Sequence, residues 1–337
     1  MQLDQFIQIM RPAIEAEMQS ALSILQDKEH ADLHRMLAFH LGWDEDGNLS
    51  DSSGKRIRPL LVTLTAATAG AKWQTGLPAA VAVEFVHNFS LIHDDIQDES
   101  PMRRGRPSVW KKWGVAQAIN AGDTMYSLAH LTLMKLEDTV SVEVANQAAH
   151  LLPSTCLALT QGQFLDLAYE SRTDLSESDY WPMVKRKTAA LIAASTELGA
   201  MVAVVDSKKR AQYREFGEFL GLAFQVQDDI LGIWGDSTIT GKSAESDLVS
   251  GKKSYPVLWG LMQAGPFAKR WYEGNIQLEE VEELAAQLTH EGAYEQSQQT
   301  AKEMTDRALN TLDAIGTTSG AGEALRTLAK RLLNRQE

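Results

Sequence analysis

Apolar residues recur at spacings of three and four along this chain, and this spacing constrains the fold more than any other feature of the sequence. Residues at that spacing share one face of an α-helix. The pattern is clearest near the two ends, at Leu3, Phe6, Ile7, Met10, Ile14 and Met18 and at Leu325, Leu328, Ala329, Leu332 and Leu333. The alternation of apolar and polar residues that is typical of strands nowhere extends over a convincing length. The sequence therefore predicts an all-α protein.

Helix-breaking residues are scarce. Nine prolines and 23 glycines are spread over 337 residues, and the stretches between them are rich in Ala, Leu, Met, Gln and Glu, which lose little on entering a helix. The clearest breaks lie at 42–54 and 232–253, and no other segment has the composition of a linker. We found no internal repeat of fixed period. We therefore expect a single continuous domain over residues 1–337.

The chain is acidic, with 32 Lys and Arg against 45 Asp and Glu and a net charge of −13 at pH 7. That charge repels nucleic acid and anionic membranes, so an anionic substrate would need a local cluster of cations. Cys156 is the only cysteine, which excludes an intrachain disulfide and suits a reducing compartment. There is no signal-peptide pattern, and no uninterrupted apolar run approaches the roughly 18 residues of a membrane span. We expect a soluble, cytoplasmic protein without a nucleic-acid partner or stable membrane insertion.

Aspartates interrupt two apolar runs. Asp94 and Asp98 would share a helix face, with Cβ atoms about 5–6 Å apart. Asp228 and Asp229 stand in a second apolar run, between Phe-Gln-Val-Gln and Ile-Leu. Carboxylates in a buried segment need a partner, and Mg²⁺ prefers carboxylates together with water and phosphate oxygens. If the two helices face one another, they would line a cleft suited to Mg²⁺ and a bound diphosphate.

Cations flank both acidic clusters. They are Lys55 and Arg58 before the first cluster, Arg103, Arg104 and Arg106 behind it, and Lys187, Lys242 and Lys252, with the donors Thr188 and Gln225, near the second. Arginine offers a planar fork that matches phosphate oxygens, and lysine supplies a point charge. Each one alone is more often a solvated surface group. Together with the carboxylates they predict a diphosphate held by metal on one side and by cations on the other.

Short motifs follow one another from Gly54 to Pro256. In chain order they are Gly-Lys-Arg-Ile-Arg-Pro, Leu-Ile-His-Asp-Asp-Ile-Gln-Asp, Met-Arg-Arg-Gly-Arg-Pro, Gly-Gln, Lys-Thr, Phe-Gln-Val-Gln-Asp-Asp-Ile-Leu-Gly, Gly-Lys-Ser and Gly-Lys-Lys-Ser-Tyr-Pro. This set resembles the isoprenyl diphosphate synthase, or polyprenyl synthetase, family. The resemblance implies a single-domain isoprenoid synthase fold, with helices around a deep central cavity, that binds Mg²⁺ through its aspartate motifs and is usually a homodimer.

The resemblance also implies roles for individual residues. The expected catalytic residues are Asp94, Asp98, Asp228, Arg103 and Lys187; the three aspartates match the metal ligands, and Asp95 and Asp229 match the carboxylates that support them. Lys55, Arg58, His87 and Arg104 match the isopentenyl diphosphate site, whereas Arg103, Lys187, Thr188, Gln225, Lys242 and Lys252 match the allylic diphosphate site. One position departs from the family pattern, because the second motif commonly ends in a third aspartate and Gly232 stands there.

The implied reaction is a Mg²⁺-dependent, head-to-tail condensation of isopentenyl diphosphate with an allylic diphosphate. Ser90 lies one turn before Asp94. The residue before it, Phe89, would point about 140° away from Asp94, so its role in chain length rests on the resemblance. An aromatic residue followed by a small one resembles short-chain enzymes that make geranylgeranyl diphosphate. Farnesyl and geranylfarnesyl diphosphate remain open as products.

Two other kinds of protein share the aspartate motifs. A lyase or cyclase that ionises a prenyl diphosphate would need no second diphosphate site, so Lys55, Arg58, His87 and Arg104 argue against it. A non-catalytic partner subunit would normally lack some of the aspartates or cations. Apart from the glycine at 232, none is missing here.

Overall fold

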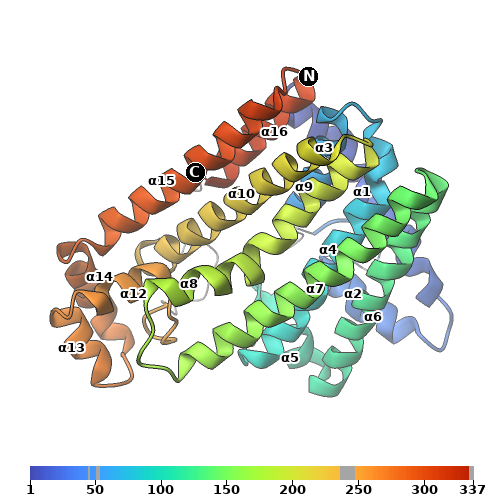
Figure 1. The fold of residues 1–337 in the computed structure, drawn as a ribbon. Coiled ribbons are helices and arrows are strands. Elements are labelled where there is room, and N and C mark those ends of the chain that lie inside the picture. Colours follow the sequence, from blue (N-terminus) through green and yellow to red (C-terminus); the bar gives the residue numbers. More distant parts are fainter. Residues whose placement is uncertain (45, 51–53, 236–246, 334–337) are drawn as a thin grey trace. The chain divides into compact units, whose positions relative to one another are not determined.

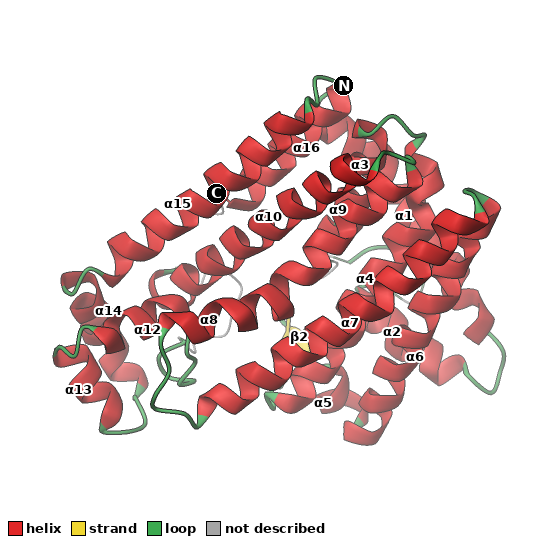
Figure 2. Ribbon diagram, in the orientation of Figure 1, coloured by secondary structure: helices red, strands yellow, loops and turns green. Residues whose placement is uncertain are grey.

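The computed structural model describes residues 1–44, 46–50, 54–235 and 247–333. Helices make up most of this part of the chain (Figure 2). Its strands are the two-residue β1 (Met102–Arg103) and β2 (Arg106–Pro107), which pair antiparallel, and an isolated bridge joins Trp43 to Leu49. The prediction of an all-α protein is confirmed.

The chain forms two compact units, each assembled from segments that are separate in the sequence. Figure 1 labels the helices and colours them along the sequence. Unit 1 comprises 1–156, 194–214 and 315–328, and unit 2 comprises 157–193, 215–314 and 329–337 as far as the structure describes them. The expectation of a single domain stays a prediction, and so does the central cavity.

Unit 1 contains the N-terminal helices. They are α1 (Leu3–Leu22), η1 (Ser23–Leu25), α2 (Ala31–Leu41), α3 (Ile57–Thr68), η2 (Trp73–Gly76), α4 (Leu77–Gln97), α5 (Val109–Trp113), α6 (Val115–Met134) and η3 (Lys135–Asp138). Unit 2 contains α8 (Glu177–Val184), the π-helical turn η4 (Lys185–Ala189), α12 (Tyr255–Met262), α13 (Pro266–Tyr272), η5 (Leu278–Glu280) and α14 (Val281–His290). Helices α7 (Val142–Glu170), α9 (Ala190–Val202), α10 (Ser207–Trp234), α15 (Ala293–Ile315) and α16 (Gly320–Leu333) contribute residues to both units.

The core of unit 1 is built on α4. This helix packs against α1, α3 and α6, and every residue from Pro78 to Val86 is buried. The apolar positions predicted for α1 lie in the same core, since Met10, Ile14 and Met18 are fully buried. The period of three and four therefore identified the buried face of α1 correctly.

The core of unit 2 lies where α12, α13 and α14 pack together. Val257, Phe267 and Leu288 are each inaccessible to solvent, and they pack with Leu248, which follows the gap in the described residues. This cluster fixes the segment that carries Lys252, a predicted diphosphate ligand.

Among the described residues, Trp73–Gln97 is the one helical stretch long and apolar enough to cross a membrane by length and composition. The mean hydropathy of its most apolar window is 1.2, and 67% of that window is buried inside the structure. A buried core helix of a globular protein passes the same test, and α4 occupies the core of unit 1.

Candidate active site

The first acidic motif lies at the C-terminal end of α4. Asp98 is the residue that follows the helix, and its backbone nitrogen donates to the carbonyl of Asp94 at 2.9 Å. The Asp94 side chain is 22% exposed and Asp98 is exposed, whereas the Asp95 side chain is 1% exposed. Two adjacent aspartates therefore face different surroundings. The carboxylates of Asp94 and Asp98 are accessible, one helical turn apart.

Asp95 holds Arg103. The Nε and Nη2 atoms of Arg103 both lie 2.7 Å from Asp95 Oδ1, and Nη2 lies 3.8 Å from Asp94 Oδ2. Burial raises the pKa of Asp95 to about 6, although the charge of Arg103 opposes the shift. The second oxygen, Oδ2, is buried without a hydrogen-bond partner in the described structure. The buried carboxylate thus fixes a cation beside Asp94.

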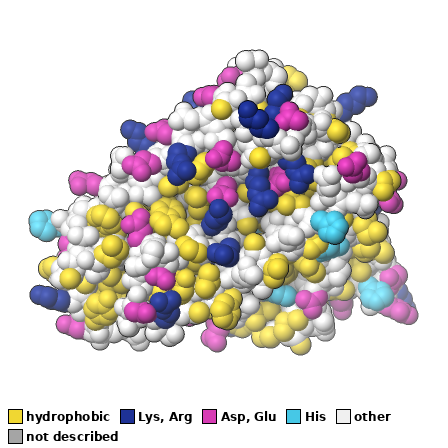
Figure 3. Space-filling view, viewed as in Figure 1, with side chains coloured by type: hydrophobic (Ala, Val, Ile, Leu, Met, Phe, Trp, Pro, Cys, Tyr) yellow, Lys and Arg dark blue, Asp and Glu magenta, His cyan; other side chains and the backbone are white. Residues whose placement is uncertain are grey.

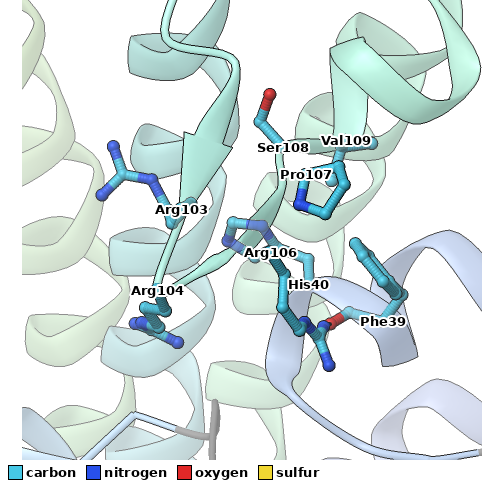
Figure 4. A pocket seen from close by; sticks show the side chains of 8 residues that line it. All are labelled: Phe39, His40, Arg103, Arg104, Arg106, Pro107, Ser108 and Val109. Carbon is cyan, nitrogen blue, oxygen red and sulfur yellow. The ribbon is translucent and has the colours of Figure 1, made fainter. Parts of the chain in front are cut away.

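A tight hairpin presents three arginines. Arg104 and Gly105 connect β1 to β2 with φ values of 51° and 73°, the left-handed conformation that a two-residue hairpin of the I′ type uses. Arg103, Arg104 and Arg106 point in different directions from this hairpin (Figure 4). Arg106 lies over the ring of Phe39 at 4.1 Å and donates to its carbonyl. Each arginine therefore has a different set of contacts.

All four predicted isopentenyl diphosphate residues lie in unit 1. A side-chain carbon on Gly54 would stand 3.0 Å from Arg104 Nη2, so this guanidinium packs directly on the backbone before the exposed Lys55. Burial, followed by the charges of Arg58 and Arg104, lowers the pKa of His87 well below its ordinary value. Burial and the neighbouring cations therefore favour the neutral form of His87.

The three hairpin arginines, Arg103, Arg104 and Arg106, also line a pocket in unit 1 (Figure 4). The other residues that line it are Phe39, His40, Pro107, Ser108 and Val109. Burial lowers the pKa of His40 well below its ordinary value, and the charges of Arg104 and Arg103 add to the shift. The sequence analysis missed His40, which has no motif to mark it. Figure 3 shows cations and carboxylates interspersed on one face of the molecule. The chain as a whole is acidic, so the three arginines at this pocket form a local cluster of positive charge.

The second acidic motif lies on α10. The Asp229 carboxylate is 1% exposed and accepts hydrogen bonds from Tyr180 Oη at 2.8 Å, Gln225 Nε2 at 2.8 Å and the Tyr255 backbone nitrogen at 3.0 Å. Burial raises the pKa of Asp229 to about 6, although the charge of Lys252 opposes the shift. Asp228 is only partly buried. The pattern of the first motif recurs, with one aspartate engaged in the core and its neighbour nearer the surface.

The predicted allylic diphosphate residues in unit 2 join this network. Thr188 Oγ1 donates to Gln225 Oε1 at 2.6 Å, and Lys187 forms an ion pair with Asp166. Lys252 Nζ lies 4.0 Å from Asp229 Oδ1. Burial lowers the pKa of Lys252, but nearby carboxylates, that of Asp247 first, outweigh it and raise the pKa above its ordinary value. Lys242 lies outside the described residues, and Arg103 belongs to unit 1.

Two glycines allow close packing around the turn that carries Lys187 and Thr188. A side-chain carbon on Gly162 of α7 would lie 2.2 Å from the backbone nitrogen of Lys187, and one on Gly221 of α10 would lie 2.6 Å from Cα of Ala189. The turn is π-helical, an irregularity that is frequent at functional sites. The glycine of the Gly-Gln motif, Gly162, therefore has a steric reason, which the sequence analysis did not supply.

The side chain of Asp247 lies next to Gly232, the position at which the family commonly has a third aspartate. A side-chain carbon on Gly232 would lie 2.3 Å from Oδ2 of Asp247, and the Asp247 backbone nitrogen donates to the Gly232 carbonyl at 3.1 Å. The Oδ2 atom is buried without a hydrogen-bond partner in the described structure. A carboxylate therefore occupies the space that a side chain at 232 would enter.

Among the described residues, the structure forms no group of three or more His, Cys, Asp or Glu side chains suited to hold a metal ion. Asp94 and Asp98 belong to unit 1 and Asp228 to unit 2. Mg²⁺ is usually bound through one or two carboxylates, several waters and substrate phosphates. The accessible carboxylate pair at the end of α4 fits that mode, because it offers oxygen donors and leaves positions for water and phosphate.

The two predicted chain-length residues lie on α4. The Phe89 ring meets the Tyr126 ring of α6 edge-on, with centroids 5.1 Å apart, and the His93 ring at 5.5 Å. Ser90 Oγ donates to the His87 carbonyl at 2.8 Å. The sequence analysis missed Tyr126, because nothing in the motifs indicates which α6 residue meets Phe89.

Comparison with known proteins identifies the family. A family model described as polyprenyl synthetase matches residues 47–290. The (2E,6E)-farnesyl diphosphate synthase of Mycobacterium tuberculosis is 43% identical over 269 residues, which cover 78% of this chain and 74% of that protein. The geranylgeranyl diphosphate synthase of Methanosarcina mazei is 38% identical over 267 residues, 79% of this chain and 82% of that protein.

A solved structure agrees over nearly the whole chain. The polyprenyl synthase of Caulobacter crescentus, complexed with calcium and isoprenyl diphosphate, has a TM-score of 0.85 at 29% identity, covering 99% of this chain and 98% of that one. The fold, the motifs and these relatives together define a prenyltransferase. The chain belongs to the polyprenyl synthetase family, among the short-chain prenyl diphosphate synthases. The family resemblance is confirmed, while the roles of individual residues stay predictions.

The packing at Gly162 predicts a strong effect of one methyl group. We expect Gly162→Ala to lower the free energy of unfolding by about 1–3 kcal/mol, because the added carbon meets backbone that cannot move aside. Displacement of Lys187 should also lower turnover. Thermal unfolding and turnover measure the two effects. Gly76→Ala is the control, since its added carbon would meet neighbours at 3.5 Å or more. Equal melting temperatures for both variants would contradict the steric argument.

Proposed function

We propose that this chain condenses isopentenyl diphosphate with an allylic diphosphate in a Mg²⁺-dependent reaction and that its main product is geranylgeranyl diphosphate. The observation that carries the proposal is that Lys55, Arg58 and Arg104, with His87, all belong to unit 1. Arg104 packs against the backbone of Gly54, next to Lys55. Burial lowers the pKa of His87, and the charges of Arg58 and Arg104 lower it further. A cyclase of the same fold has no use for this second diphosphate site.

Each substrate would have its own set of residues. Arg58, His87 and Arg104, with Lys55, would bind isopentenyl diphosphate, and Arg103 with Lys187, Thr188, Gln225, Lys242 and Lys252 would bind the allylic diphosphate. Asp94, Asp98 and Asp228 would hold Mg²⁺, which as a Lewis acid would offset the negative charge of the leaving diphosphate. Asp95 and Asp229 would keep the surrounding donors in place through the hydrogen bonds that they accept.

The residues of the chain would favour ionisation by stabilising the departing diphosphate in a site from which water is excluded. Arginine and lysine groups that are already held by carboxylates need little reorganisation when that charge develops. Arg103 is held by Asp95, and Lys187 by Asp166. No side chain of the motifs is an obvious general base, and the departing diphosphate is the proton acceptor that the family resemblance implies.

We also propose that the protein is a cytoplasmic homodimer. The family resemblance supports the dimer, and α6 offers a surface for a second copy. Four of its apolar residues are between 43% and 59% exposed: Val115, Ile119, Leu131 and Met134. Burying such residues against a second copy would remove apolar area from water.

The metal-site proposal predicts the effect of removing either aspartate motif. We expect Asp94→Ala and Asp228→Ala each to lower turnover by at least about a hundredfold, because the diphosphate charge is left uncompensated. Product sizing after incubation with isopentenyl diphosphate, allylic diphosphates and Mg²⁺ measures turnover, and circular dichroism measures folding. Asp306→Ala, at an exposed position of α15, is the control. Wild-type rates for both site variants at saturating Mg²⁺ would end the proposal.

Neighbouring arginines should serve different substrates. We expect Arg104→Ala to raise chiefly the KM for isopentenyl diphosphate and Arg103→Ala to raise chiefly that for the allylic diphosphate. Each lost contact should cost about 2–5 kcal/mol, as in other buried charge pairs. Arg106→Ala is a matched control on the same hairpin, since its guanidinium contacts Phe39. Similar changes in both KM values for Arg103→Ala and Arg104→Ala would refute the assignment.

Product length should follow the bulk of two α4 residues. We expect Phe89→Ala to lengthen the products, because it removes the ring that meets Tyr126, and Ser90→Phe to shift them towards farnesyl diphosphate. Each buried methylene gains about 0.8 kcal/mol, so steric contact rather than affinity should end elongation. Product chromatography compares the variants with Tyr126→Phe, which keeps its ring. An unchanged product distribution for Phe89→Ala would mean that residues of another helix limit the chain length.

A further inference from the structure

Arg56 lies between two predicted isopentenyl diphosphate ligands, yet its side chain is buried. Lys55 before it is exposed and Arg58 is partly buried, whereas Arg56 is 1% exposed. Its φ is 51°, a left-handed conformation that costs free energy in a residue with a side chain. It is also the residue that precedes the first turn of α3. The cation at the centre of the motif is thus turned into the protein at a strained backbone position.

The guanidinium joins three helices of unit 1. Arg56 Nε donates to Glu15 Oε1 of α1 at 2.7 Å, and Nη2 lies 3.3 Å from Glu15 Oε2. Nη1 donates to Glu84 Oε1 of α4 at 3.2 Å, and Nη2 donates to the carbonyl of Leu41, the last residue of α2, at 2.7 Å. A lysine offers one nitrogen and cannot reproduce this planar set of contacts.

The two carboxylates are themselves held in place. Trp43 Nε1 donates to Glu15 Oε2 at 2.9 Å, and Asn88 Nδ2 donates to Glu84 Oε1 at 3.1 Å. Glu84 and Asn88 flank His87 on α4, so the network also fixes the turn that presents His87. All the groups in this network are buried, where an unpaired charge would be costly.

The network carries one negative charge in excess, since two glutamates meet one arginine. The electrostatic effect of Glu84 on Arg104 shows that this buried network lies near the arginines of the hairpin. Burial lowers the pKa of Arg104, and Glu84 opposes that shift. The negative charge of buried Glu84 therefore offsets part of the repulsion between neighbouring arginines in the absence of substrate.

We propose that Arg56 is a positioning residue, which through Glu15 and Glu84 fixes Lys55, Arg58 and His87 in the geometry that binds isopentenyl diphosphate. The inference rests on the proposed function. The buried guanidinium holds residue 56 in its left-handed conformation, and that conformation directs the residues on either side. Release of the guanidinium would let the start of α3 relax and would move both flanking cations.

The test is Arg56→Lys, which keeps the charge and loses the fork. We expect the KM for isopentenyl diphosphate to rise about tenfold while the KM for the allylic diphosphate changes less than twofold. Binding of isopentenyl diphosphate measured by calorimetry should weaken by the same factor. Glu15→Gln, which retains the shape and removes one charge, is a milder second variant in case Arg56→Lys does not fold. It should change the same KM in the same direction by a smaller factor.

The matched control is Glu197→Gln. Glu197 is a buried carboxylate of α9 that pairs with Arg210 at 2.7 Å and Arg214 at 3.2 Å, and neither α9 nor α10 carries a predicted isopentenyl diphosphate residue. We expect it to lower the melting temperature without a selective change in KM. Equal changes in the two KM values for Arg56→Lys and Glu15→Gln, or a lower melting temperature alone, would overturn the inference. A wild-type protein that does not consume isopentenyl diphosphate would instead overturn the proposed function.

Discussion

The burial of carboxylates inside apolar helices is the constraint on which the rest of the site depends. An ionised carboxylate in the core is tolerated only when donors or cations surround it. In the first motif Arg103 pairs with Oδ1 of Asp95, and in the second motif Tyr180, Gln225 and the backbone of Tyr255 donate to Asp229. In each motif one aspartate, Asp95 or Asp229, is buried and hydrogen-bonded, and its neighbour, Asp94 or Asp228, is more exposed. The buried member fixes the donors around it, so the accessible member stands in surroundings that cannot rearrange freely.

The same principle explains how several arginines can gather in an acidic chain. The arginines around the hairpin in unit 1 would repel one another if they lay on an uncompensated surface. Asp95 pairs with Arg103, and Glu84 acts on Arg104 while it also holds Arg56. Buried carboxylates of unit 1 therefore offset part of the positive charge of these arginines. The excess of acidic residues in the composition is therefore compatible with a local cluster of cations, because some of those acidic residues pair with the arginines.

Much of this could be predicted from local patterns, and the rest depended on contacts between distant residues. The period of three and four identified the buried face of α1, and the motif order identified the family that the relatives confirm. Nothing near Lys187 in the sequence indicates Asp166 as its partner, and nothing near Asp229 indicates Tyr180. The π-helical turn at 185–189 also escaped prediction, and so did its close packing against two glycines on other helices. Partners of this kind are set by packing in three dimensions, which a single sequence does not reveal.

The contact between Gly232 and Asp247 ties two positions that lie 15 residues apart. Restoring aspartate at 232 would complete the motif as it is commonly written, yet the new side chain would enter space that the Asp247 carboxylate already fills. A side chain at 232 would therefore require either a smaller residue at 247 or a displaced Asp247 side chain. Gly232 thus leaves room at the end of the motif for a carboxylate that comes from a later segment of the same chain.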